Sequence, residues 1–86
     1  MEPQTDALFF LFQWTSENEV HLAEHGVTPE EFAEVVTNPD FVQRSRSTGR
    51  PIAFGETSTG KYLACIYELI DDVIVLPITA YEPDEK

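Results

Sequence analysis

The stretch GVTPEEFAEVVTNP, from Gly26 to Pro39, predicts a helix whose two ends are both marked. Thr28 can cap the helix, Pro29 suits the first helical position, and Glu31 completes a capping box with the threonine. Pro39 marks the end, because the residue before a proline is driven out of helical geometry. Between these signals, apolar residues keep the i, i+3, i+4 spacing of a core-facing helix, at Phe32, Val35 and Val36.

The chain before this helix predicts a strand and an earlier helix. The run ALFFLFQW, Ala7–Trp14, is apolar on both faces, which is typical of a strand. Ser16 and Glu19 then have the spacing of a capping box and predict a helix that opens at Ser16. That helix should stop at Gly26, since glycine suits the left-handed conformation just past a helix end. The two helices together form a helical hairpin.

After Pro39 the pattern changes to strands separated by short turns. Four strand-like segments follow: FVQRSRS (41–47), PIAFGET (51–57), KYLACIYELI (61–70) and VIVLPITAY (73–81). Turn residues at 48–49, 58–60 and 71–72 separate them. Pro77 cannot donate to a ladder, so the last strand should be an edge or bulged there. The sequence predicts an α+β fold in the order β-α-α-β-β-β-β, with a two-helix hairpin packed on a mostly antiparallel sheet.

Length and composition predict one globular domain spanning residues 1–86. Hydrophobic residues make up 42% of the chain, which favours a packed core over disorder. The single cysteine, Cys65, cannot form an internal disulfide and suits a reducing compartment. The N-terminal MEPQTD is unlike a secretory signal, and the longest apolar run is too short to span a bilayer. We therefore expect a cytoplasmic protein.

The charge of the chain is strongly acidic and unevenly placed. Sixteen acidic and five basic residues give a formal charge of -11. Most of this surface should repel a phosphate backbone, because nucleic-acid binding relies on Lys and Arg displacing counterions. Four of the five cations lie between residues 44 and 61, namely Arg44, Arg46, Arg50 and Lys61. Two interpretations stay open, a solvated acidic surface that aids solubility or one positive patch on an acidic body.

The segment HLAEH, His21–His25, matches the H-x-x-E-H pattern of a class of zinc hydrolases. Its two histidines share a helical face, but a catalytic zinc needs a third protein ligand, and no downstream motif supplies an obvious one. His25 also directly precedes Gly26, where a histidine can interact with the last carbonyl groups and the helix dipole. We therefore predict a capping role for His25 and no metal or other cofactor.

Several motifs together resemble BrnT-like toxins of the RelE superfamily. FQWTSENEVHLAEHGVTPEEFAEVVTNPD, residues 12–40, resembles their opening, in which a tryptophan-ended strand leads into a helix ending in His-Gly-Val and a second helix ending in Asn/Asp-Pro. SRSTGRPIAFGETSTGKYLACIY (45–67) and ITAYE (78–82) resemble the hairpins and the last strand that follow. The likeness covers most of residues 9–82.

The resemblance implies a small bacterial ribonuclease paired with an antitoxin. In the family, basic and aromatic residues on the sheet face the RNA; the matching positions here are Arg44, Arg46, Arg50, Lys61, Tyr67 and Tyr81. Cleavage needs cations to stabilise the transition state, with Arg44, Arg46 and Lys61 as candidates, and proton-transfer groups, with His21, Tyr81 and Glu82 as candidates. Family members usually carry arginine in the last strand, where this chain has LPITAYE without a cation.

A non-catalytic role is the alternative. ALFFLFQW and KYLACIYELI are apolar on both faces, and only one face of a sheet can rest on two helices. The other face would need a partner chain or a second copy of this one. An acidic chain would suit a small basic partner. The sequence thus predicts either an RNA-cleaving toxin with an antitoxin-like partner or a protein-binding module.

Overall fold

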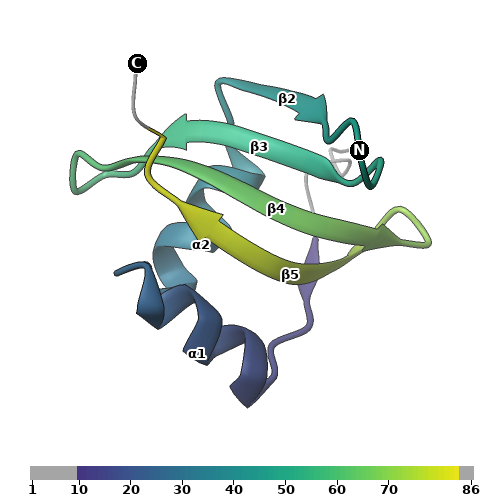
Figure 1. Cartoon of the computed structure of the whole chain (residues 1–86), viewed down its shortest axis with the longest axis horizontal. Coiled ribbons are helices and arrows are strands. Elements are labelled where there is room, and N and C mark those ends of the chain that lie inside the picture. Colours follow the sequence, from purple (N-terminus) through teal and green to yellow (C-terminus); the bar gives the residue numbers. More distant parts are fainter. Residues whose placement is uncertain (1–9, 84–86) are drawn as a thin grey trace, which may run out of the picture.

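A computed structural model describes residues 10–83, which form a sheet with two helices against it (Figure 1). The elements are β1 (Leu11–Phe12), α1 (Ser16–Glu24), α2 (Pro29–Thr37), β2 (Phe41–Arg44), β3 (Pro51–Glu56), β4 (Tyr62–Ile70) and β5 (Ile74–Tyr81). The strands form one sheet in the order β1-β5-β4-β3-β2. The α+β class and the order β-α-α-β-β-β-β predicted from the sequence are confirmed.

Strands β2 to β5 form an antiparallel meander, and β1 lies parallel to β5 at one edge. The N–H groups of Leu11 and Gln13 donate to the carbonyls of Val73 and Val75, at 2.8 and 2.9 Å. The predicted strand over 7–14 is shorter in the structure, and residues 7–9 lie outside the described range. The chain leaves the sheet after Gln13, and Trp14 packs edge-on against Phe32, with ring centroids 5.7 Å apart.

Helix α2 begins as the sequence predicts. The Thr28 hydroxyl accepts from the Glu31 N–H, and the Glu31 carboxylate accepts from the Thr28 N–H, both at 3.1 Å. Gly26 has a φ of +74°, the left-handed conformation expected just past the first helix. Val27 and Phe32, which flank the cap, are both buried in the core. The predicted end is also confirmed, since Asn38, the residue before Pro39, is the C-cap of α2.

Helix α1 begins at Ser16, but the prediction of a Ser16 cap paired with Glu19 was wrong, because the cap lies one residue earlier. Thr15 is the cap, and it exchanges hydrogen bonds with Asn18 at 3.1 and 2.9 Å. The Asn18 amide also donates to the Pro77 carbonyl of β5, at 3.4 Å, beyond the point where β1 ends. A buried asparagine can thus cap the helix and satisfy the sheet at once, which an exposed Glu19 cannot do.

The turns and the bulge lie close to their predicted places. Asp71 and Asp72 both have positive φ, at 54° and 66°, as the two central residues of a tight hairpin turn require. Ile66 pairs with Thr79 but Tyr67 pairs with Pro77, so β5 carries one extra residue and is bulged as predicted. The predicted strand over 41–47 was too long, because β2 ends at Arg44.

The core lies between the helices and one face of the sheet. Helix α1 packs on β5, and α2 packs on β3 and β4. The core residues from the helices and their connection are Leu22, Val27, Phe32, Val35 and Val36, and those from the sheet include Ala53, Leu63, Cys65, Val75 and Ala80. We call the side of the sheet that these residues contact the covered face, and the other side the open face. Within residues 10–83 no helix is long and apolar enough to cross a membrane.

Candidate functional site

The three arginines of the predicted basic patch lie at the end of the sheet where β2 turns into β3. Arg44 ends β2 and donates to the Gly49 carbonyl across the turn, at 2.7 Å. Arg50 lies 3.8 Å from the Glu68 carboxylate of β4. Arg46 belongs to the turn and not to β2, although the predicted strand over 41–47 included it. The reason is that Ser45 begins the turn, with its N–H bonded to the Arg50 carbonyl at 2.8 Å.

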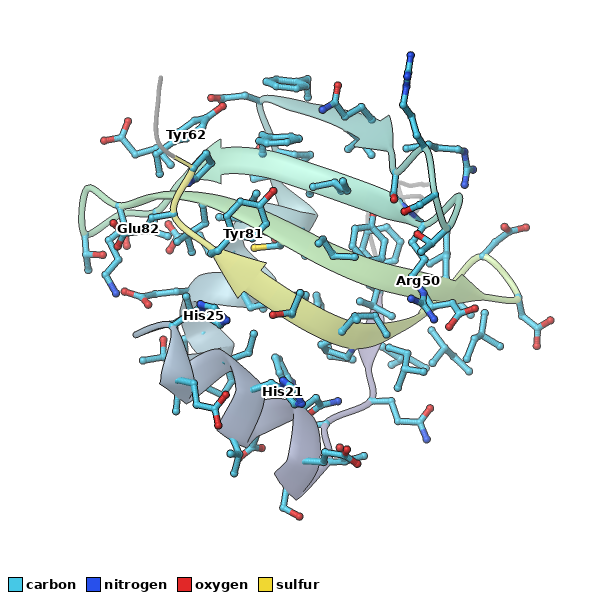
Figure 2. All side chains as sticks on the ribbon, viewed as in Figure 1. His21, His25, Arg50, Tyr62, Tyr81 and Glu82 are labelled. Atoms are coloured by element: carbon cyan, nitrogen blue, oxygen red, sulfur yellow. The ribbon has the colours of Figure 1, made fainter. Side chains whose placement is uncertain are left out.

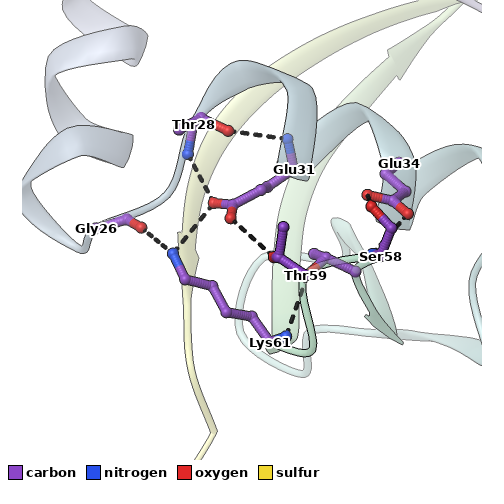
Figure 3. A network of polar contacts seen from close by, with 8 residues as sticks. Gly26, Thr28, Glu31, Glu34, Ser58, Thr59 and Lys61 are labelled. Carbon is purple, nitrogen blue, oxygen red and sulfur yellow. Dashed lines mark hydrogen bonds and ion pairs between the residues drawn. The ribbon is translucent and has the colours of Figure 1, made fainter.

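Lys61 lies at the opposite end of the sheet from these arginines, beside the turn from β3 to β4. Figure 3 shows its ammonium group donating to the Gly26 carbonyl and pairing with the Glu31 carboxylate at 3.2 Å. In the same network, the Thr59 hydroxyl donates to Glu31 at 3.3 Å. These contacts tie a sheet turn to the start of α2. The sequence prediction that all four cations adjoin is therefore wrong, because residues 51–56 of β3 separate the two turns.

Charge and hydrogen bonding in this network lower the pKa of the Glu31 carboxyl. The Thr28 N–H bond lowers the pKa of its carboxyl below the ordinary value of 4.5, partial burial opposes that change, and Lys61 and Thr59 lower it further. A lowered pKa means that the ionised carboxylate stabilises the fold. Lys61 and Glu31 thus hold the helix layer against the sheet.

The proton-transfer candidates lie in different regions. His21 is on α1, beside a groove of about 560 Å³ formed with Thr15, Glu17 and Asn18 and with residues 76–79 of β5. Tyr81 ends β5 and lies on the open face, followed by Glu82 (Figure 2). Tyr67 is buried on the covered face, and burial raises the pKa of its hydroxyl, while Arg44 lowers it. No single constellation therefore joins His21, Tyr81 and the three arginines.

The arginine end of the sheet does contain a hollow of about 450 Å³. Its lining residues include Arg44, Arg50, Tyr67, Glu68 and Asp72. Guanidinium groups are suited to phosphate oxygens, but two carboxylates of this lining oppose an anion.

The two histidines of the zinc-like motif are both exposed on the first helix and its cap. His25 is the C-cap residue, and its backbone N–H donates to the Leu22 carbonyl at 2.9 Å. Across residues 10–83, no group of three or more His, Cys, Asp or Glu side chains lies close enough to hold a metal ion. The role of the His25 side chain as a cap stays a prediction.

The open face of the sheet is apolar, and sequence reasoning only partly identified it. Strand pairing brings large side chains from four strands onto this side, and neither helix of the described residues, 10–83, covers them (Figures 1 and 2). Its members are Phe41 of β2, Ile52 and Phe54 of β3, Tyr62 and Ile66 of β4, and Leu76 and Tyr81 of β5. Phe41 and Phe54 stack with ring centroids 4.7 Å apart, and Phe41 is still 49% exposed.

Phe41, Ile52 and Phe54 were the residues that the sequence analysis missed. The available signal was the order of small and large residues in β3, where Ile52 and Phe54 alternate with Ala53 and Gly55. Ala53 and Gly55 face the helices, so the large residues must face away from them.

Searches of protein families, of curated proteins and of solved structures found no match to this chain. The resemblance to BrnT-like toxins therefore stays a prediction from the sequence.

Proposed function

We propose that this protein is a protein-binding module and that its partner covers the open face of the sheet. The single observation that supports this function is the stack of Phe41 on Phe54 within an apolar face that α1 and α2 leave uncovered. Monomeric proteins rarely leave contiguous apolar patches of this kind in water, and such patches commonly mark interaction sites. Aromatic residues such as Tyr62 and Tyr81 are also enriched at protein interfaces.

Charge defines the kind of partner. Carboxylates lie at the margins of the apolar patch: Glu56 and Glu68 belong to the open face, opposite Tyr62 and Leu76, and Glu82 follows Tyr81, while the chain as a whole carries a formal charge of -11. A partner with an apolar centre and basic flanks complements such a surface. This supports, together with the resemblance, a small basic antitoxin-like protein as the partner of a toxin-like chain. The free thiol of Cys65 is buried and suits the reducing cytoplasm in which we place the pair.

The test is co-expression with the product of the neighbouring gene, followed by copurification and calorimetry. Tyr62 and Tyr81 are 37% and 38% exposed, so a lysine at either position should leave the fold intact. Tyr62→Lys and Tyr81→Lys should each weaken binding at least about tenfold, because each places a charge in an apolar interface. The matched control is Val20→Lys on α1, whose side chain is 55% exposed and lies away from the sheet. Binding that survives both tyrosine variants but fails in the control would refute the open-face assignment.

RNA binding at the arginine end is the second candidate, supported by the hollow that Arg44 and Arg50 line. In this role the arginines would contact phosphates, and any cleavage would use Tyr81, Glu82 or His21 for proton transfer. Affinity for single-stranded RNA should fall steeply with added salt. The double variant Arg44→Ala, Arg50→Ala should abolish both binding and any growth arrest on expression, while Lys61→Ala should not. RNA binding that is equal in the double variant and the wild type would exclude this candidate.

A further inference from the structure

Strand β2 is an exposed edge of the sheet. On its outer side no further strand pairs within residues 10–83. Helix α2 packs on β3 and β4 and stops short of this edge, so Val42 on the covered side is 48% exposed (Figure 1). Edge strands are commonly protected by short length, charged residues, proline or a bulge. β2 is short and ends in Arg44, but Phe41–Arg44 contains no proline, lysine or bulge in its register with β3.

The hydrogen bonds to β3 define which backbone groups face outward. The Ser45 N–H donates to the Arg50 carbonyl at 2.8 Å. Residues of an antiparallel strand alternate between bonding the neighbour and facing away from it. Val42 and Arg44 therefore present both their N–H and their carbonyl groups to the outer side. Asp40 presents only its carbonyl, because its N–H donates to the Phe54 carbonyl at 2.7 Å.

We propose that the outer edge of β2 binds β2 of a second copy of this chain, antiparallel, about a twofold axis at Val42. In this register Val42 lies opposite Val42 of the second copy, and Asp40 lies opposite Arg44. Each Val42 N–H bonds the carbonyl of the other Val42, and each Arg44 N–H bonds the carbonyl of the opposite Asp40. Two half-exposed valines become buried, and two carboxylate–guanidinium pairs form. Arg44 keeps its bond to Gly49, since a guanidinium has five donors.

Charge selects this register and this surface. Moving the axis by two residues in one direction sets Asp40 opposite itself, and in the other it sets Arg44 opposite itself. Like charges directly opposite each other destabilise a strand pair. Arg44, Arg46 and Arg50 also make this end the least acidic part of a chain with a charge of -11, so it is where two copies repel each other least.

The resulting dimer has one continuous sheet made of two five-stranded sheets. The open face stays free on both copies, so this inference is independent of the proposed function. A dimer edge on β2 and a partner surface on the open face would give one assembly with two partner sites.

Charge reversal tests the pairing by sedimentation and light scattering over a range of concentrations. The wild type should dimerise with increasing concentration. Asp40→Arg and Arg44→Asp should each weaken the dimer about tenfold or more, because each variant makes both charge pairs repulsive. The double variant should restore it, and mixing the two single variants should give a heterodimer. Arg46→Asp, which makes the same change of charge outside the register, should weaken the dimer much less than Arg44→Asp, because it adds only general repulsion and breaks no charge pair.

Cross-linking tests the position of the axis. Val42→Cys should form a disulfide-linked dimer under mild oxidation, because hydrogen-bonded opposite residues have Cα atoms about 5.5 Å apart, within disulfide reach. Gln43→Cys, whose opposite residue is Phe41, should not cross-link. The native Cys65 is buried and will not interfere. A wild type that stays monomeric at millimolar concentration, failed rescue by the double charge swap, or cross-linking at 43 instead of 42 would each overturn the proposal.

Discussion

The two faces of the sheet differ in side-chain size. Small residues lie on the face that the helices cover, and large apolar residues lie on the face that is open to water. On β3 the covered face has Ala53 and Gly55, whereas the open face has Ile52 and Phe54. A Cβ atom at Gly55 would lie 3.4 Å from the Cα of Pro39, so close approach of the backbone limits side-chain size there. Within residues 10–83 no helix packs on the open face, and contact with water does not favour large apolar side chains there. The difference teaches that packing limits side-chain size on the covered face, whereas the large apolar residues of the open face fit the partner that we propose for it.

The largest expected effect contrasts the two faces directly. Phe32→Ala should destabilise the protein by about 3–5 kcal/mol, because it removes a fully buried ring and leaves a cavity in the core. Phe41→Ala on the open face should cost only about 1 kcal/mol, since that ring is half exposed and loses mainly its stacking on Phe54. Urea unfolding followed by circular dichroism measures both. Equal losses would mean that the open face is part of the folded core.

A thiol reagent should separate the same two faces. Burial raises the pKa of Cys65 on the covered face to about 12. At pH 8 its thiolate fraction is then about a thousandfold below that of an exposed cysteine, equivalent to about 4 kcal/mol. Native Cys65 should therefore react only after urea unfolding, whereas a Tyr62→Cys variant should gain one fast-reacting thiol. Rapid labelling of Cys65 in the native wild type would show that the helix layer opens readily.

The covered face and its helices were largely predictable, because their signals are local. The cap at Thr28, the glycine at 26 and the apolar spacing of α2 all lie within a few residues of one another. The prediction placed the α1 cap at the wrong residue, because Asn18 bonds the Pro77 carbonyl, 59 residues away, as well as Thr15. Sequence spacing cannot show such a contact.

The candidate site was less predictable, because it depends on the end of the sheet at which each turn lies. Arg50 and Lys61 are only eleven residues apart, and yet they lie at opposite ends of the sheet, since one strand length separates two successive turns. The open face was foreseen from strands with apolar residues on both faces. Its main contributor, the Phe41–Phe54 pair, required the register of β2 with β3.

A smaller effect on stability is expected from the cap at the start of α2, one of the two helices on the covered face. Thr28→Ala should cost about 1 kcal/mol, because the Glu31 N–H loses its acceptor at the start of α2. The matched control is Thr37→Ala, whose exposed hydroxyl donates to the Ala33 and Glu34 carbonyls of its own helix, at 2.8 and 3.3 Å. Its loss should change stability by less than about 0.5 kcal/mol. Denaturant midpoints that coincide for Thr28→Ala and the wild type would place the start of α2 elsewhere.

The smallest expected effect is the pH dependence of that anchor. The Thr28 N–H bond and the nearby Lys61 hold the pKa of Glu31 below its ordinary value of 4.5. A carboxyl with a lowered folded-state pKa stabilises the fold above the unfolded value, and this contribution is lost as the pH falls through the folded value. Glu31→Gln keeps the hydrogen-bonding shape but not the charge, so at pH 7 it should cost less than about 1 kcal/mol. The difference from the wild type should shrink steadily below pH 4.5.

Glu30→Gln is the matched control for this change. Glu30 lies in the same first turn of α2 but is exposed, and within residues 10–83 its side chain makes no hydrogen bond or ion pair. Unfolding free energies of the three proteins should be measured from pH 7 to pH 3. Only for Glu31→Gln should the difference from the wild type change with pH. A pH-independent cost of Glu31→Gln would assign its effect to packing rather than charge, and the anchor between the sheet turn and α2 would then rest on the Ser58 N–H bond to Glu34, at 2.7 Å.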